Sequence, residues 1–232
     1  MTMDKMDRLQ NTIGYTFKNK ALLRNALTHS SFLNECGDKS QKSNERLEFL
    51  GDAVLGLVIG QYLFDTNPDV HEGILTKARA STVCEETLAD LAMEINLGEC
   101  LFMSRGEIKN GGTKRKSALS DATEALIAAI YLDSGLEEAR KFIIRYLSDT
   151  ADEAVTSKSM TTDYKTKLQE YVQKSNGRFS YKLVGESGPD HDKTFEVELF
   201  INGESISKGN GNSKKNAEQK AAKKALEIFG EK

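Results

Sequence analysis

Three carboxylate side chains follow one another at spacings of three and four residues: Glu45, Glu48 and Asp52. On a helix, these spacings place all three on one face. The residues between Leu47 and Ile59 are otherwise mostly apolar, which is typical of a buried helix. Carboxylates are rarely buried unless something pairs with them. Taken alone, the triplet is explained most simply as a water-facing acidic stripe.

A second acidic stripe occurs downstream, where Asp121 and Glu124 are three residues apart in an alanine-rich apolar segment. Small residues let two helices approach closely, so the two stripes can face each other. Unless a cation lay between them, repulsion would arise among four carboxylates: Glu48, Asp52, Asp121 and Glu124. Oxygen ligands without His or Cys at ligand spacing indicate a hard divalent ion, Mg²⁺ with Mn²⁺ as its substitute. Such an ion suits phosphodiester hydrolysis, because it activates water and stabilises charge on the leaving oxygen.

The sequence predicts that the part of the chain around the two acidic stripes is all α. Helices are expected over residues 44–64 and 74–97, the second ended by Gly98, and over 120–132 and 136–147. Residues 104–117 form a glycine-rich basic loop that lacks the spacing of a nucleotide-binding loop, so no organic cofactor is expected. We expect this loop to be mobile. His29 could serve as a general base, but no Ser or Cys nucleophile pattern accompanies it, which favours a hydrogen-bonded structural histidine.

The second part of the chain shows a different order of elements. It predicts a helix over 163–174, strands over 179–184, 194–201 and 204–209, and a final helix after residue 212. Asn202–Gly203 is a strong hairpin signal between the last two strands. The fold class is therefore an all-α domain, residues 1–152, followed by a linker, 153–162, and a small α+β domain of order α-β-β-β-α, 163–232.

Charge divides along the same boundary. Residues 1–160 carry a net charge of −5, whereas residues 161–232 hold 13 basic and 11 acidic side chains and carry +2. An acidic first part suits a metal site, and a basic second part suits a polyanionic partner.

Cysteine usage and the N-terminus bear on the compartment. Cys36, Cys84 and Cys100 have no paired or metal-like spacing, which is typical of free thiols in a reducing cytoplasm. The first ten residues lack the apolar core of a signal peptide, and no apolar run approaches the ~18 residues of a membrane span. We therefore expect a cytoplasmic protein without a membrane segment.

Residues Asn44–Leu55 resemble the signature stretch of bacterial ribonuclease III, and Asp121–Ile127 resembles the second acidic motif of that family. From about Asp163 the chain resembles a double-stranded RNA-binding domain. The resemblance covers roughly residues 9–229 in the expected order. It implies a magnesium-dependent endoribonuclease that cleaves both strands of an RNA duplex and leaves 5′-phosphate and 3′-hydroxyl ends. The roles implied are processing of ribosomal RNA precursors and turnover of messenger RNA.

The same resemblance assigns the acidic residues. It implies that the metal is held by Glu48, Asp52, Asp121 and Glu124, of which Asp52 and Glu124 act in catalysis. Glu45 and Glu72 would line the cleft near the interface of a homodimer. Two positions depart from the family pattern, because Thr123 replaces a bulky apolar residue and Ala128 replaces glycine. Neither change removes a ligand, so both concern local packing more than activity.

RNA contacts are expected in the second domain. Lys214 and Lys215 fall in a first helical turn, where the helix dipole disfavours cations. This placement is explained if phosphate oxygens bridge the lysines and the N-terminus of the helix. The resemblance implies contacts to the RNA duplex, which read its shape more than its sequence, from Thr166, Gln169, Glu170, Gln173, His191 and Ser213 as well as from the two lysines. Lys77 and Arg79 could face phosphates or form a plain solvated face.

Two alternatives come from other functional classes. The first is a non-catalytic regulator that binds double-stranded RNA and uses its first domain only for dimerisation. Four retained acidic positions argue against it, because like charges held together are unfavourable without a metal. The second is a small-molecule phosphohydrolase, which the basic RNA-binding domain makes the weaker interpretation.

Overall fold

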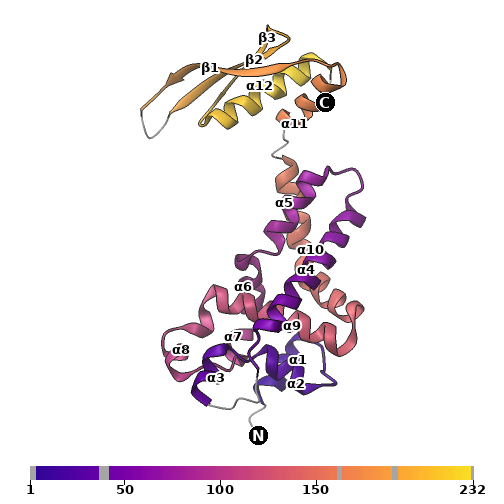
Figure 1. Ribbon diagram of the computed structural model, residues 1–232, viewed down its shortest axis with the longest axis vertical. Coiled ribbons are helices and arrows are strands. Elements are labelled where there is room, and N and C mark those ends of the chain that lie inside the picture. Colours follow the sequence, from indigo (N-terminus) through magenta and orange to yellow (C-terminus); the bar gives the residue numbers. More distant parts are fainter. Residues whose placement is uncertain (1–3, 37–41, 161–163, 190–192, 231–232) are drawn as a thin grey trace. The chain divides into compact units, whose positions relative to one another are not determined.

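The computed structural model describes residues 4–36, 42–160, 164–189 and 193–230. The chain divides into two compact units, Met1–Met160 and Thr161–Lys232, and each is described by itself. The first unit is helical, as predicted (Figure 1). Its elements are α1 (Lys5–Ile13), α2 (Lys20–Ala26), α3 (Ser30–Cys36), α4 (Glu45–Thr66), α5 (Glu72–Thr82), α6 (Glu85–Glu94), α7 (Leu97–Cys100), α8 (Arg105–Lys109), the 3-10 turn η1 (Gly112–Lys114), α9 (Lys116–Ser134) and α10 (Leu136–Met160).

Helices α4 and α9 form the centre of this unit and carry the two acidic stripes (Figure 1). Every residue of α9 from Ala125 to Ile130 is buried. The two helices touch at Gly51, where an added Cβ atom would lie 1.9 Å from the carbonyl oxygen of Glu124. Only glycine fits this approach, and it brings the acidic residues of α4 beside those of α9.

The sequence predicts that α4 is buried on every face except the acidic one, but the structure leaves a second side of this helix exposed. Phe49, Leu57 and Phe64 are 82%, 58% and 72% exposed. By length and composition α4 resembles a membrane span, as core helices of globular proteins often do. Here its inner side packs along α9, and its outer side presents an apolar stripe.

The helix predicted over residues 74–97 is wrong, because the structure breaks it in two. Helix α5 ends at Thr82, Cys84 is extended (φ −78°, ψ 160°), and α6 begins at Glu85. The hydroxyl of Thr87 donates to the carbonyl of Ser81 at 3.0 Å and holds the turn. The break lets α5 pack against α10 and α6 pack against α9.

Gly98, predicted to end that helix, lies inside α7 instead. An added Cβ atom would lie 2.2 Å from the carbonyl oxygen of Thr113, so glycine allows η1 to approach α7. The preceding turn is made by Asn96, which has a left-handed conformation (φ 55°).

The segment predicted as a mobile basic loop is largely ordered by local contacts. The hydroxyl oxygen of Ser104 accepts the backbone N–H of Glu107 at 3.1 Å and caps α8. The Glu107 carboxylate forms an ion pair with Arg115, which precedes α9. The segment is therefore fixed at both ends beside the start of α9.

Helix α10 continues beyond the predicted end of the first domain. It runs to Met160 and therefore includes residues 153–160 of the predicted linker. Ala154 and Val155 are buried against the core of the first unit, and their packing explains why polar neighbours do not end the helix.

The second unit confirms the predicted α-β-β-β-α order. It consists of α11 (Tyr164–Lys174), β1 (Phe179–Ser187), β2 (Thr194–Ile201), β3 (Glu204–Gly211) and α12 (Lys214–Ile228). The strands form one antiparallel sheet in the order β1-β2-β3, and both helices cover the same face (Figure 1). The hairpin turn lies at Asn202 and Gly203, both with positive φ. Leu168, Val172 and Leu199 lie in the core between sheet and helices.

Candidate functional site

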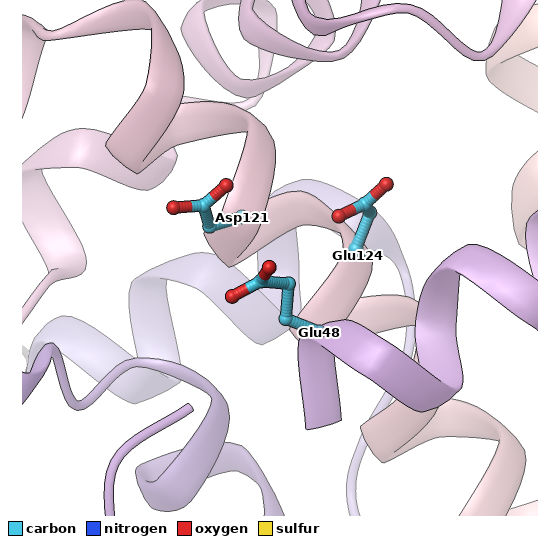
Figure 2. Close-up of side chains that lie close together, drawn as sticks. All are labelled: Glu48, Asp121 and Glu124. Carbon is cyan, nitrogen blue, oxygen red and sulfur yellow. The ribbon is translucent and has the colours of Figure 1, made fainter. Parts of the chain in front are cut away.

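Three of the four predicted metal ligands meet between α4 and α9. One carboxylate oxygen from each of Glu48, Asp121 and Glu124 lies within 4.8 Å of the others. Figure 2 shows Glu48 extending from α4 toward the two carboxylates of α9. Spacings of this size allow one cation to contact all three side chains, and each side chain is half-buried.

The carboxylates of this group disfavour one another's ionisation. Burial, followed by the charges of Asp52, Glu48 and Asp121, raises the pKa of Glu124 to about 7. Burial, with the charges of Asp121 and Glu45, also raises the pKa of Glu48. A divalent cation would remove this repulsion, and an all-oxygen set of donors suits Mg²⁺ or Mn²⁺. The residues present therefore fit the expected metal.

Asp52, the fourth predicted ligand, lies at the edge of the group. Its side chain is exposed, and it does not belong to the three-residue cluster found among the described residues. After burial, however, its charge is the largest cause of the raised pKa of Glu124. Asp52, one helical turn after Glu48 on α4, therefore affects the site through its charge, which raises the pKa of Glu124.

The two additional acidic residues are placed differently from each other. Glu45 is exposed and accepts a hydrogen bond from the Ser43 hydroxyl at 2.9 Å, and its charge contributes to the raised pKa of Glu48. Glu72 is exposed at the start of α5, where it accepts a hydrogen bond from the Thr76 hydroxyl at 2.7 Å. In the described part of this unit, Glu72 does not join the cluster.

The two departures from the family pattern are accommodated by the fold. Thr123 is fully buried, and its hydroxyl donates to the carbonyls of Leu119 at 2.9 Å and Leu88 at 3.2 Å. The hydroxyl thus has partners on both α9 and α6. Ala128 is also fully buried.

One further acidic residue that acts on the site has no signal in the local sequence pattern. After burial, the charge of Glu85 is the largest cause of the raised pKa of Asp121. Glu85 is the first residue of α6, and this position exists only because the helix predicted over 74–97 is broken. A pattern of local spacing could not have found it.

His29 forms the hydrogen bond expected of a structural histidine. Its Nδ1 atom lies 2.8 Å from Oγ of Ser31. Burial and the charge of Arg115 lower the pKa of His29, while Asp121 and Glu45 act in the opposite direction.

The predicted RNA contacts of the second unit form two groups. Exposed side chains on the first helix, α11, are Thr166, Gln169, Glu170 and Gln173, and their spacing places them on one side of it. The second group lies at the start of α12. His191 lies outside the described residues.

At the start of α12, Ser213 accepts the backbone N–H of Asn216 at 3.2 Å and caps the helix. Lys214 and Lys215 are exposed in the first turn. Lys214 pairs with Glu186 at 3.8 Å. The capped helix end and the two lysines together form a site that can accept phosphate oxygens.

Comparison with known proteins covers both units. A family model described as Ribonuclease-III-like matches residues 19–150, and one described as double-stranded RNA binding motif matches residues 164–228. Proteins named Ribonuclease 3 from Pelotomaculum thermopropionicum and Desulforamulus reducens are 47% and 49% identical. The matches cover 96% and 97% of this chain and 92% and 91% of theirs.

A solved structure is also similar to the first unit. It is the nuclease domain of ribonuclease III from Campylobacter jejuni, with 46% identity and a TM-score of 0.58, and the match covers 62% of this chain and 97% of that one. The sequence matches therefore extend over nearly the whole chain, and the structural match covers its helical part. The chain belongs to the ribonuclease III family, as a double-strand-specific endoribonuclease with a C-terminal double-stranded RNA-binding domain.

Proposed function

We propose that Glu48, Asp121 and Glu124, with Asp52 beside them, hold Mg²⁺ and that this site cleaves RNA duplexes. The observation that carries the proposal is the convergence of three carboxylate oxygens within 4.8 Å, between two helices that touch through glycine. When bound, a divalent cation activates water and stabilises charge on the leaving oxygen. Mn²⁺ takes similar oxygen ligands and is expected to substitute.

The chain's own residues have separate tasks in this proposal. Glu48, Asp121 and Glu124 hold the cation together with Asp52, and Asp52 and Glu124 also act in catalysis. Because the pKa of Glu124 is raised to about 7 without metal, protons and cation compete for its oxygens near neutral pH. Water adds to phosphorus and the bond to the 3′ oxygen breaks, which leaves a 5′-phosphate and a 3′-hydroxyl.

A homodimer is proposed from the apolar stripe on α4. By helical period, Phe49, Ala53, Leu57, Gly60 and Phe64 share one side of the helix, and its three large apolar residues are more than half exposed. Exposed contiguous apolar surface of this kind marks an interaction site. The related Campylobacter jejuni domain is described as having a region involved in dimer formation. Glu45 and Glu72 are proposed to line the cleft of the dimer.

The second domain is proposed to supply affinity for the duplex. The polar residues of α11, together with Ser213, Lys214 and Lys215 at the start of α12, would contact sugar hydroxyls and phosphates. We place the boundary between the domains after Met160, where the chain divides into compact units. A cytoplasmic location and roles in ribosomal and messenger RNA processing complete the proposal.

The test is cleavage of a long perfect RNA duplex under three conditions: with Mg²⁺, with EDTA, and with the Glu124→Gln variant plus Mg²⁺. Short duplex products are expected only in the first, while the variant still binds RNA. Cleavage that survives both EDTA and the substitution would contradict the four-carboxylate site. Binding without cleavage in all three conditions would favour the regulator instead.

A further inference from the structure

Helices α11 and α12 of the second unit are joined by polar contacts at the start of α11. The Nζ atom of Lys165 donates to a carboxylate oxygen of Glu218 at 2.6 Å. The backbone N–H of Lys165 donates to the side-chain oxygen of Gln219 at 3.2 Å. An N–H in the first turn of a helix has no acceptor within its own helix, so this bond caps α11 from α12. One residue of α11 is therefore tied to α12 through both its backbone and its side chain.

The ion pair between Lys165 and Glu218 is partly shielded from water. The two side chains are 33% and 26% exposed. The Nζ atom of Lys165 also lies 5.0 Å from the centre of the Tyr181 ring on β1, a distance at which a cation is attracted to an aromatic ring. Shielding strengthens the attraction between the charges, because water screens them less. The pair is therefore a fixed contact, unlike a pair of fully exposed side chains.

Farther along the two helices, the contact between them is apolar. The rings of Tyr171 and Phe229 stack with their centres 5.0 Å apart, and Leu168 and Val172 are buried in the same core as the alanines of α12. Apolar packing is non-directional, whereas hydrogen bonds require defined distances and angles. The polar contacts of Lys165 therefore fix how far α11 lies along α12.

The two groups that we propose contact RNA lie next to this pair in the chain. Thr166, the first of the α11 group, directly follows Lys165, and Glu218 lies one helical turn after Lys214 and Lys215. A duplex is recognised by its shape, through sugar hydroxyls and phosphates at fixed separations. The distance between the two groups therefore has to match the duplex, and the ion pair lies where it can set that distance.

The pair also determines what the Glu218 carboxylate contacts. Residues three and four apart on a helix are neighbours, so Glu218 can reach the side chain of Lys214 or Lys215. The structure instead pairs Glu218 with Lys165, and it pairs Lys214 with Glu186 at 3.8 Å. A negative charge one turn from the phosphate-accepting lysines is thereby compensated from α11.

We propose that Lys165 and Glu218 are positioning residues for duplex RNA. Their ion pair sets the distance between the polar residues of α11 and the lysines at the start of α12, and it holds the Glu218 carboxylate away from those lysines. Neither side chain touches the RNA itself. The inference rests on the proposed function, because it requires both groups to contact the duplex.

Three full-length variants test the pair: Lys165→Met, Glu218→Met and the double variant. Methionine keeps most of the length of either side chain and removes its charge. All variants carry Glu124→Gln to prevent cleavage, and affinity for duplex RNA is measured by fluorescence anisotropy at several salt concentrations, with circular dichroism to verify folding. Both single variants should bind roughly 5-fold more weakly, and the double variant should bind no more weakly than either, because the two side chains act through one contact.

Two features of the result separate positioning from a simple effect of charge. Glu218→Met removes a negative charge near the phosphate site, so electrostatics alone predicts tighter binding, whereas loss of the pair predicts weaker binding. In Lys165→Met, the slope of log affinity against log salt concentration should not change, whereas loss of a phosphate contact would lower it by about 1. Lys165→Arg keeps the cation and should bind within about two-fold of the Glu124→Gln chain. Lys208→Met, at the longer pair with Glu198, is the control and should do the same.

The inference is overturned if Glu218→Met binds RNA as tightly as the Glu124→Gln chain or more tightly, or if the effects of the two single variants multiply in the double variant. If Lys165→Met fails to fold, the direction of the change in Glu218→Met still decides. Failure of the proposed RNA site is distinguishable, because then Lys214→Ala and Lys215→Ala would also leave the affinity unchanged.

Discussion

Gly51 of α4 lies against the backbone of Glu124 on α9: a Cβ atom on Gly51 would lie 1.9 Å from the Glu124 carbonyl oxygen. Real side-chain atoms cannot occupy that distance, and the opposing atom belongs to a rigid backbone. The separation of α4 and α9, and with it the spacing of the carboxylates, therefore depends on glycine at this position.

Gly51→Ala is expected to abolish most cleavage, by at least about 100-fold, because the helices must separate and one cation can no longer reach both. Overpacking of this kind also lowers the free energy of unfolding of the protein by roughly 1–3 kcal/mol. Gly73→Ala is the control, because in the described part of the chain an added Cβ at Gly73 would meet no atom within 4 Å beyond its chain neighbours and the backbone of its own helix. Cleavage assays and thermal unfolding measure both effects. An active Gly51→Ala enzyme would refute the close-contact explanation.

Metal-free stability should depend on pH through Glu124. Its pKa is raised from 4.5 to about 7 in the folded state, so the folded state holds this proton more tightly than the unfolded state does. The contribution of this proton to the free energy of unfolding is fully present below about pH 4.5 and is lost as the pH rises to about 7. In EDTA, Tm should fall over this interval by a few degrees, about 2–4 °C for each kcal/mol.

Glu124→Gln is the matched test of that dependence. The variant cannot ionise, so its Tm should fall less between pH 4.5 and 7, and at pH 7.5 without metal it should unfold at a higher temperature than the unsubstituted chain. Adding Mg²⁺ should raise the Tm of the unsubstituted chain more than that of the variant. Equal pH dependence in both proteins would mean that Glu124 does not carry this charge repulsion.

Leu57→Asp is expected to weaken dimerisation. The substitution places a charge in the exposed apolar stripe of α4, where burial against a second copy would desolvate it. A rise of the dissociation constant by at least about 100-fold corresponds to roughly 2.7 kcal/mol. Sedimentation or light scattering measures the oligomeric state. Met93→Asp, at an exposed apolar residue of α6 outside the stripe, should remain dimeric. If both variants stay dimeric, another surface forms the interface.

Lys214 and Lys215 should contribute to RNA affinity without sequence preference. Replacing either lysine by alanine should weaken duplex binding severalfold. The slope of log affinity against log salt concentration should also fall by about 1, because one phosphate contact is lost. Binding is measured by fluorescence anisotropy in the Glu124→Gln background, so that cleavage does not interfere. Lys208→Ala on β3, where Lys208 pairs with Glu198, is the control. An unchanged salt slope in the Lys214 and Lys215 variants would exclude direct phosphate contacts.

Local sequence patterns were sufficient to predict much of the secondary structure of this protein and the acidic faces of its helices. Spacings of three and four residues identified the acidic faces of α4 and α9, because helical period converts spacing into position. Alternation and Asn202–Gly203 identified the strands and the hairpin turn, because the turn requires positive φ at both residues. The α-β-β-β-α order followed from the same signals.

Other features depend on contacts between distant segments. The break at Cys84 carries no Pro or Gly signal, and it arises because α5 and α6 pack against different helices. Helix α10 passes through polar residues to Met160 because Ala154 and Val155 are buried in the core. In both places tertiary packing overrides local preference, which is a weak determinant of helix ends.

The acidic site shows the same division. Glu48, Asp121 and Glu124 could be named from spacing, but their distance from one another depends on the fit of Gly51 against α9. The charges of Glu85 and His29, which act on the pKa of Asp121, come from segments far away in the chain. Local periodicity fixes which face of a helix a residue occupies, whereas the packing of helices fixes which faces meet and how much charge is buried between them.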